Sequence, residues 1–253
     1  MKNWNSKPKF KAIGIAVLSY GLLAAGLSAN DFVTMDELLD EDLDGSTVEV
    51  QDPFESVNRA IFKFNDFIYL KVMDPAASAY QAITPDSVEG KLSNFFDNLN
   101  YPVRLAGNLM QGKVEGALLE SSAFVINTTV GVVGLFRPSE KFPRIASLPK
   151  EDLGQALGAW GLGEGPYLVL PIQGPSSVRD FAGWFADRTI HPLQKPITQV
   201  DEDKVRTAYS LGKTVGNSPT LMQRYQQTKS SALDPYVALR NAYLQYREAA
   251  VRD

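Results

Sequence analysis

The sequence predicts a mostly α-helical single domain, and three observations lead to this fold class. Apolar residues recur at intervals of three and four in several segments, as they do on one face of a helix. Proline and glycine separate these segments, while strand-like alternation is scarce, because the segment PYLVLPI is short and bounded by prolines. The chain of 253 residues, 44% of them apolar, is long enough for one well-buried core.

Residues 1–29 have the pattern of a secretory signal peptide. Four lysines precede sixteen uncharged residues from Ala12 to Leu27, and a stretch of small residues follows them. The apolar run is shorter than the ~20 residues that a membrane-spanning helix needs. We expect cleavage after Ala29, and a retained N-terminal anchor is the alternative.

Residues 30–51 form an acidic leader. Ten acidic residues and no basic residue lie between Asp31 and Glu55, and such a block is typical of a solvated, flexible segment. The segment from Asp40 to Gly45 resembles the start of a calcium loop, but Gln51 stands where the loop needs a bidentate acid. We therefore expect no metal site here, with weak calcium binding as the alternative.

The folded domain is predicted over residues 52–253, and it begins with a helix. Asp52 is a plausible N-cap, with Pro53 at the first helical position. One apolar stripe follows, made of Phe54, Val57, Ile61, Phe64 and Ile68.

Further helices are predicted at residues 84–100, 101–113, 114–136, 201–216 and 234–252. The run from Ser121 to Phe136 carries no charge, yet it is too short and too polar to span a bilayer. It is either a core helix or a helix that lies partly in a membrane.

Composition and motifs argue against nucleic-acid binding and catalysis. The net charge is −4, and cysteine is absent, which excludes disulfides and thiolate chemistry. The segment Gly107 to Val114 nearly matches a phosphate loop, but Val114 replaces the required hydroxyl. His191 is the only histidine, and the sequence has no G-x-S-x-G motif. We expect no enzyme activity and no cofactor, and we expect His191 to be a loop residue.

The most unusual segment is GAWGLGEGPYLVLP, in which glycine stands at positions 158, 161, 163 and 165. Glycine allows the backbone to bend without steric cost, and hinges form at such places. Trp160 and Tyr167 beside an apolar run also suit a membrane interface. A plain glycine-rich turn that leads into a buried segment is the alternative.

The chain resembles the MlaA (VacJ) family of outer-membrane phospholipid-transport proteins. The matching segments run in the family's order from Asp52 to Glu248, and they read DPFESVNRAIFKFND, LSNFFDNLNYPVRLAGNLMQGK, FVINTTVGVVGLFRPS, LGQALGAWGLGEGPYLVLPIQGPSSVRD and DPYVALRNAYLQYRE.

This resemblance implies a ring-shaped helical bundle embedded in the inner leaflet of the Gram-negative outer membrane, with a central amphipathic channel. Such proteins remove phospholipids misplaced in the outer leaflet and pass them to a soluble periplasmic carrier, while trimeric porins hold the ring. The implied function is therefore phospholipid transport without catalysis. A non-transporting scaffold or porin-associated binding protein is the alternative.

The resemblance also implies roles for five residues. Gly161, Gly163 and Gly165 match the family segment that hinges a channel-lining loop. Phe64 and Asn65 match an aromatic-Asn step in the family's first helix that is tied to channel gating.

One feature departs from the family pattern. Many members carry a lipid on an N-terminal cysteine, and this sequence contains no cysteine. We therefore expect an exported protein on the periplasmic face of the outer membrane, held by apolar surface or by porin contacts rather than by a lipid anchor.

Overall fold

The computed structural model describes residues 52–82, 84–191, 222 and 225–252. The predicted signal peptide, the acidic leader with its calcium-like segment, and the predicted helix at residues 201–216 lie outside these residues.

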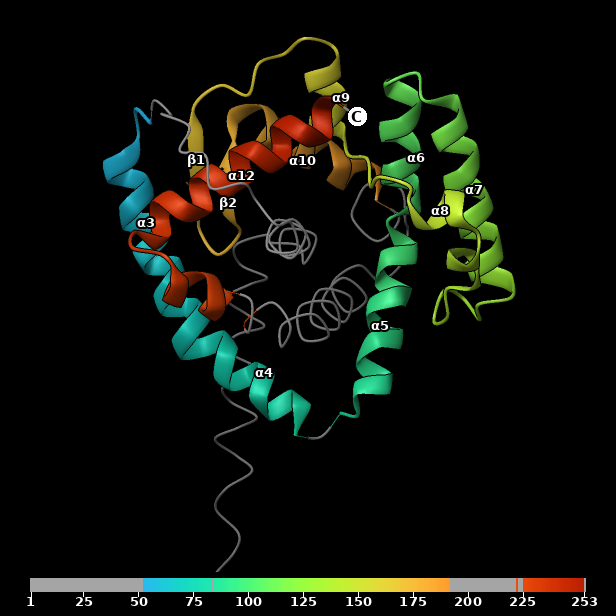
Figure 1. Cartoon of the computed structure of the whole chain (residues 1–253), viewed down its shortest axis with the longest axis horizontal. Helices are drawn as coiled ribbons and strands as arrows, with labels where there is room; N and C mark the ends of the chain where they lie inside the picture. The colour runs from blue at the N-terminus through green and yellow to red at the C-terminus, as the bar shows by residue number, and fades with distance from the viewer. Residues whose placement is uncertain (1–51, 83, 192–221, 223–224, 253) are drawn as a thin grey trace, which may run out of the picture.

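The described part of the chain is mostly helical, as predicted. Its elements in order are α3 (Glu55–Ile68), the π-helical segment η1 (Tyr69–Met73), α4 (Asp74–Gln81), α5 (Asp86–Leu99), α6 (Tyr101–Met110), α7 (Val114–Thr129), the 3₁₀ turn η2 (Pro138–Lys141), α8 (Pro143–Ala146), α9 (Leu153–Ala159), β1 (Tyr167–Leu170), β2 (Gly174–Ser177), α10 (Val178–Ile190) and α12 (Pro235–Arg252). Figure 1 shows these elements arranged around a ring-like outline, with α3 and α7 on opposite sides. Among the described residues, no helix is both long and apolar enough to cross a membrane.

The start of α3 differs from the prediction. Its N-cap is Phe54, which makes no side-chain capping bond. The Asp52 carboxylate instead accepts hydrogen bonds from Asn58 Nδ2, at 3.0 Å, and from the Tyr236 hydroxyl of α12. Asp52 thus joins the first and last described helices instead of capping one of them.

Burial on α3 and α7 is the reverse of the usual pattern for a water-soluble helix. The residues that α3 buries are Asn58 and Asn65, while Phe64 and Phe67 are exposed. The buried face of α7 consists of Ala117, Glu120, Ala123 and Asn127. Soluble proteins usually bury the apolar face of a surface helix, so these two helices turn their polar groups inward.

The helix predicted at residues 114–136 ends earlier than expected, at Thr129. After Thr129 the chain turns sharply, with positive φ angles at Val132 (54°) and Val133 (58°). A Cβ at Gly131 would lie 2.2 Å from the Phe136 carbonyl oxygen, so the turn needs glycine there. Both valines are exposed, and the turn therefore presents apolar side chains at its tip.

A two-stranded hairpin forms where the sequence gave little indication of a strand. β1 and β2 pair antiparallel, with Tyr167 opposite Ser177 and Leu170 opposite Gly174. The segment is indeed too short to start a larger sheet, but a single hairpin needs only these four pairs. Helices α9 and α10 were also not predicted.

The apolar core lies beneath α12 and is rich in tyrosine. Tyr236, Leu239 and Tyr243 of α12 are fully buried against Tyr167 of β1 and Tyr69 of η1. These three residues stand three and four apart, so they lie on one face of α12, and the helix predicted at residues 234–252 is confirmed. The hairpin is thus packed between the first and last described helices.

Candidate functional site

Two asparagines of α3 hold the free edge of β1. Asn58 Nδ2 donates to the Tyr167 carbonyl at 3.0 Å, and Asn58 Oδ1 accepts from the Val169 N–H at 2.9 Å. Asn65 repeats this pattern three residues further along, on the Leu170 carbonyl at 2.9 Å and the Ile172 N–H at 2.6 Å. Each amide therefore bonds the strand as a neighbouring strand would. We call these two side chains the asparagine clamp.

The neighbouring predicted residue faces the other way. Phe64 is 48% exposed, whereas Asn65 is 2% exposed. The predicted aromatic-Asn step therefore combines one side chain on the outer surface with one side chain on the hairpin.

The tip of the hairpin contains a strained residue. Ile172 has a φ of 65°, which is rare for a β-branched residue because its Cβ crowds the backbone. The Asn65 amide binds its N–H, and the Tyr69 hydroxyl donates to its carbonyl. Surrounding contacts must hold a backbone in this conformation, and here α3 and η1 supply them.

The glycine-rich segment is an exposed loop between α9 and β1. Gly161 and Gly165 have φ angles of 88° and 69°, and no atom lies within 4 Å of a Cβ placed at Gly161 or at Gly163. The loop is attached near its start, where the Trp160 indole N–H donates to the Met110 carbonyl at 2.8 Å. The loop therefore has open space around Gly161 and Gly163, and its backbone is attached on either side of them, at Trp160 and at Glu164.

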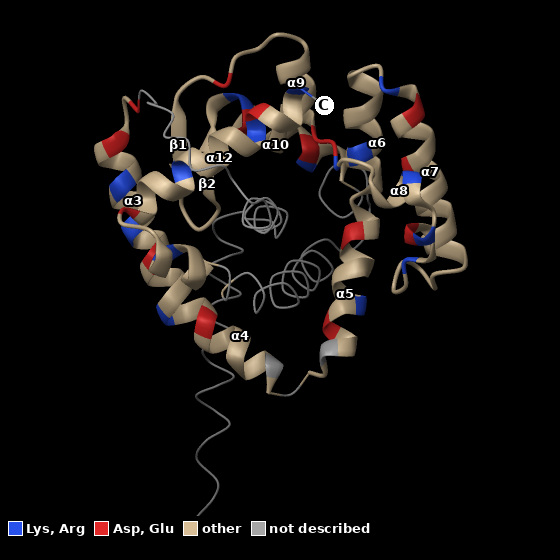
Figure 2. Cartoon of the chain, viewed as in Figure 1, with Lys and Arg blue, Asp and Glu red and all other residues tan. Residues whose placement is uncertain are grey.

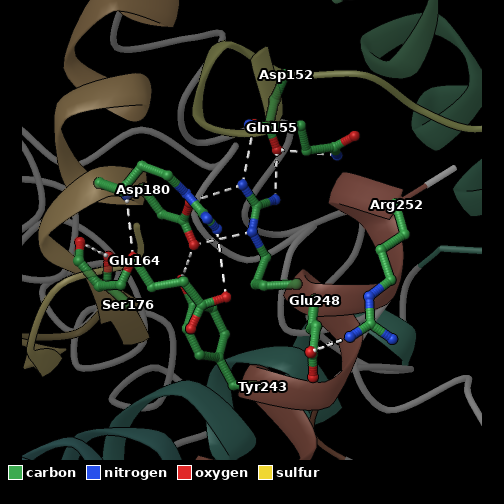
Figure 3. A network of polar contacts seen from close by, with 11 residues as sticks. Asp152, Gln155, Glu164, Ser176, Asp180, Tyr243, Glu248 and Arg252 are labelled. Carbon is green, nitrogen blue, oxygen red and sulfur yellow. Dashed lines mark hydrogen bonds and ion pairs between the residues drawn. The ribbon is translucent and has the colours of Figure 1, made fainter. Parts of the chain in front are cut away.

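A buried ionic network fixes the opposite end of this loop. The Arg247 guanidinium of α12 lies between the carboxylates of Asp152 and Asp180, with N–O distances of 2.6 to 3.1 Å (Figure 3). Arg179 bonds Asp180 at 3.0 Å and Glu164 of the loop at 3.4 Å. The network joins α9, α10, α12 and the glycine-rich loop.

The pKa values of two aspartates of α10, Asp180 and Asp187, are shifted in opposite directions from the ordinary value. Burial alone would raise the pKa of Asp180, but the Arg247 guanidinium holds it below its ordinary value. Burial and the nearby Asp152 charge raise the pKa of Asp187 to about 8. At neutral pH, Asp180 is therefore a carboxylate and Asp187 is protonated.

These groups border a polar cavity of about 120 Å³. The hairpin contributes one wall through Gln173, Pro175 and Ser176, and the others come from α5, α6, α10, α12 and residues 150–152. A second polar cavity, of about 170 Å³, lies between α6 and α7 and shares Asp97, Arg104 and Lys150 with the first. Both cavities are thus lined by side chains of both charge signs. Figure 2 shows Lys and Arg interspersed with Asp and Glu along the helices of the ring.

Other residues singled out in the sequence have structural roles. His191 lies just after the last residue of α10, as expected of a loop residue, but it is fully buried, and its Nε2 lies 3.1 Å from Asn100 Oδ1. Lys113 of the phosphate-loop-like segment pairs with Glu151 at 2.7 Å. No cluster of three potential metal ligands occurs among the residues that the structure describes.

The outer faces of α3, α7 and α10 expose large apolar side chains. We call this set the exposed apolar surface; its members on these helices and the turn after α7 are Val57, Phe64, Phe67, Val114, Leu118, Val125, Val130, Val132, Val133, Phe136, Val178, Phe181 and Phe185. Apolar area of this extent usually marks contact with a membrane or a protein.

The model of the MlaA lipoprotein family matches residues 50–250. The chain belongs to this family.

Named relatives and a solved structure agree with this assignment. The intermembrane phospholipid transport system lipoprotein MlaA of Haemophilus influenzae is 29% identical over 212 residues, 81% of each chain. The protein of the same name from Escherichia coli is 30% identical, over 77% of this chain and 76% of its own. An uncharacterized protein of Rickettsia bellii is 31% identical, over 81% and 78%.

A structure described as the structural basis for maintenance of bacterial outer membrane lipid asymmetry is 28% identical to this chain. It superimposes with a TM-score of 0.65 and covers 80% of this chain and 100% of its own. The mostly helical MlaA fold predicted from the sequence is thereby confirmed.

Within this MlaA fold, the five predicted site residues do not form one cluster. The loop that contains Gly161, Gly163 and Gly165 leads into the start of the strand, and Asn65 holds its end. Phe64 contributes to the exposed apolar surface. Their roles in gating and hinging stay predictions.

Sequence reasoning missed Asn58 and the Arg247 network. Asn58 could have been found, because a second asparagine seven residues before Asn65 falls on the same helical face. The partners of Arg247 could not, because Asp152 and Asp180 are 95 and 67 residues away in the chain.

Proposed function

We propose that this protein transports phospholipid and so maintains the lipid asymmetry of the outer membrane. It removes phospholipids misplaced in the outer leaflet and passes them to a soluble periplasmic carrier. Membership in the MlaA family supports this proposal, as do the transport names of its relatives.

One structural observation carries the proposal, namely the reversed burial of α3 and α7. A protein that moves phospholipid must offer a polar route for the headgroup, because desolvating a charged group in hydrocarbon is costly. It must also present apolar surface to acyl chains. Polar cavities lie on the inside of this protein, and Leu118 and Val125 of α7 lie on its outside.

We further propose that the exposed apolar surface holds the protein in the inner leaflet of the outer membrane, on the periplasmic face. The sequence has no cysteine that could carry an acyl chain, so this surface takes over that role, together with contacts to a trimeric porin. The proposed partners are thus phospholipid, the porin and the periplasmic carrier.

The proposed transport includes no catalytic step. His191, the histidine that a hydrolase could use, is fully buried, and its Nε2 lies 3.1 Å from Asn100 Oδ1. Moving a lipid between sites requires binding and release, but no bond of the lipid breaks.

Outer-leaflet phospholipid tests the proposal directly. Cells with and without the gene are treated with an amine-reactive reagent that does not cross membranes, and the labelled phosphatidylethanolamine is quantified. We expect more labelled lipid without the gene, with restoration by the intact gene. Equal labelling in both strains would refute transport of outer-leaflet phospholipid.

A second measurement separates transport from the scaffold alternative. Mass spectrometry of protein gently extracted from membranes reads the intact mass and the bound lipid together. Bound phospholipid on a cleaved, unacylated chain is expected for a transporter. A lipid-free protein that salt releases from the membrane would favour a scaffold.

A further inference from the structure

We propose that Asp187 of α10, together with the neighbouring Asp152, forms a subsite for the primary ammonium of a phospholipid headgroup. This inference rests on the proposed transport function and names the headgroup class that the first polar cavity selects. The observation that carries it is a carboxyl group in the wall of this cavity that has no cation of its own.

Asp187 differs from the other acidic residues that line the cavity. Each of the others has a Lys or Arg partner; they are Asp97, Glu151, Asp152 and Asp180. The Asp187 side chain accepts a hydrogen bond from the Leu153 N–H at 3.1 Å, and no Lys or Arg in the described part of the chain pairs with it. The cavity therefore offers an acidic group for which the described fold supplies no counter-ion.

Helix α10 places Asp187 in the cavity wall. Asp180, Trp184 and Asp187 stand four and three residues apart, so they share one face of the helix, and all three line the cavity. The adjacent Arg188 does not pair with Asp187, because its guanidinium lies over the Trp184 ring, 4.6 Å from the ring centroid. A cation for Asp187 therefore has to come from outside the described fold.

Asp152 supplies a second acceptor beside Asp187. Its side chain is 31% exposed although it pairs with Arg247, and its charge acts on the Asp187 carboxyl. A primary ammonium carries three N–H donors and no acceptor, so it needs several oxygens around it. Two carboxyl groups in one cavity wall provide them. A quaternary ammonium has no N–H to donate, and the site should therefore favour a primary amine.

The same cavity contains cations for the phosphate of such a headgroup. Arg104 and Lys150 line it, and Lys150 has 42% of its side chain exposed, with Nζ 3.6 Å from Asp97 Oδ1. Lysine and arginine bind phosphate through strong, charge-assisted hydrogen bonds. A headgroup with one phosphate and one ammonium thus meets a partner of opposite charge for each of its own groups.

Ammonium binding should release a proton. The pKa of Asp187 is raised to about 8, so the carboxyl holds a proton at neutral pH before the ammonium arrives. A nearby positive charge favours the carboxylate, so the proton passes to solvent as the ammonium enters, and the net charge of the site does not change. The affinity for an amine lipid should consequently increase as the pH rises from 6 toward 8.

Other charged and titratable groups surround this carboxyl. They are Arg104 of α6, residues 150–152 before α9, Tyr243 and Arg247 of α12, and Asp180 and Arg188 of α10 itself. The pKa of Asp180 is lowered, and those of Tyr243 and Arg247 are raised, so these three groups keep their charge states between pH 6 and pH 8. Asp187 is the group that we expect to respond in this range.

Competition between lipids tests the subsite. The full chain, purified in detergent, is mixed with equal amounts of phosphatidylethanolamine, phosphatidylglycerol and phosphatidylcholine that have the same acyl chains. Native mass spectrometry then measures which lipid stays bound. We expect phosphatidylethanolamine to be preferred about tenfold or more, because it alone donates charged N–H groups to the two carboxyls. Equal retention of the three lipids would overturn the subsite.

Two variants make this competition specific. Asp187→Asn removes the charge but keeps an oxygen for the Leu153 N–H, and it resembles the protonated carboxyl, so it should fold. We expect this variant to lose the preference for phosphatidylethanolamine. Glu248→Gln removes an exposed acid of α12 that does not line the cavity, and it should keep the preference. A preference that persists in Asp187→Asn would overturn the role of this residue.

Proton release gives a second, independent readout. Isothermal titration with phosphatidylethanolamine at pH 7, in phosphate and in Tris buffer, measures the protons released from the difference in heat. We expect about one proton per bound lipid for the parent protein and almost none for Asp187→Asn. Binding by the parent without proton release would contradict the exchange of a proton for the ammonium at Asp187.

Failure of the proposed function would look different. If complete removal of the gene left labelled outer-leaflet phosphatidylethanolamine unchanged, the transport function would be wrong, and the binding measurements would still decide whether Asp187 selects an amine. If the gene affected labelling but the purified protein bound the three lipids equally, transport would stand and the subsite would be wrong.

Discussion

At the scale of single residues, Arg247 is the buried cation at the centre of the ionic network. Its side chain is 4% exposed and neutralises Asp152 and Asp180, which are themselves held by Gln155 and Tyr243 (Figure 3). Removing one member of a buried ionic network leaves uncompensated charge behind, which is more costly than the network itself is stabilising. The position therefore tolerates substitution poorly.

We expect Arg247→Met to lower the free energy of unfolding by about 3–5 kcal/mol, because it leaves the partly buried Asp152 without this cation and leaves the buried Asp180 with Arg179 alone. Denaturant titration in detergent measures this loss. Arg252→Met on the same helix is the matched control, since Arg252 is 74% exposed in its pair with Glu248. Its effect should stay below about 1 kcal/mol. Equal losses of stability in the two variants would contradict the burial of Arg247 between Asp152 and Asp180.

Asp187 should make stability depend on pH. Its pKa is raised to about 8 from an ordinary value of 3.8. Between these values the folded protein holds a proton that the unfolded chain has lost, so stability is greatest below the lower value and declines as pH rises toward 8. We expect Asp187→Asn to flatten the decline measured by thermal unfolding between pH 5 and pH 8.

Asp180→Asn provides the comparison for this experiment. The pKa of Asp180 is lowered, so its contribution is lost only as the pH falls through the acidic range. The variant should lower stability without removing the slope above pH 5. A slope that persists in Asp187→Asn would show that another group causes it.

Prediction from sequence worked at residues whose role follows from a local pattern. The helix α7 was predicted from its local pattern, although it ends at Thr129 and not at residue 136, just before Gly131, where only glycine fits the close approach of the backbone. The prediction that Asp52 caps the first helix was wrong, although an Asp-Pro pair fits a helix cap. Its partners are Asn58 and Tyr236, and Tyr236 is 184 residues away in the chain. When the partners of a polar residue are distant in the chain, no local sequence pattern indicates them.

At the scale of elements, the helices could be predicted from local patterns, whereas the hairpin depends on contacts that are distant in the sequence. The spacing of apolar residues predicted α3, α5, α6 and α12 because periodicity is a local property. It could not reveal that Val57 and Phe64 of the stripe on α3 are exposed while Ile61 and Ile68 pack against the core, since the period is the same for either orientation. The hairpin was not predicted because side chains of α3, which is distant in sequence, supply three of the hydrogen bonds to β1.

The glycine-rich loop offers a test at this scale, because its glycines differ in conformation. Gly161 has a φ of 88°, whereas Gly163 does not have a left-handed conformation and has open space around it. We expect Gly161→Ala to cost about 1–2 kcal/mol of stability through backbone strain, and Gly163→Ala to cost almost nothing. Thermal unfolding of the two variants measures the difference.

The variants Gly161→Ala and Gly163→Ala also distinguish a hinge in the glycine-rich loop from a plain glycine-rich turn. If the loop bends during transport, Gly163 must adopt backbone conformations that alanine disfavours. Gly163→Ala should then impair lipid transport without affecting stability. Normal transport in this variant would leave Gly163 as part of a plain turn.

At the scale of the whole molecule, the exposed apolar surface should govern membrane attachment. Leu118 and Val125 of α7 are 64% and 57% exposed, and each would lose about 1.5–3 kcal/mol of favourable transfer on moving from lipid to water. We expect the double variant Leu118→Glu and Val125→Glu to shift the protein from the membrane pellet to the soluble fraction.

An exposed polar position provides the control for this fractionation. Ser230 lies on the surface outside this apolar set, so Ser230→Glu adds charge without removing apolar contact. It should leave the protein in the pellet. If the double variant stayed there as well, porin contacts or another anchor would hold the protein instead.

The joining of α3 to α12 has a consequence for how the chain acquires its fold. Tyr236 reaches Asp52 over 184 residues, and Asp234 pairs with Arg59 over 175. Ribosomes release a chain from its N-terminus, so the ring cannot close until its last helix has been synthesised. Contacts so distant in sequence also make closure slow. A chain whose fold closes late in this way would suit the export that the N-terminal sequence predicts, because a secretion pore admits only unfolded polypeptide.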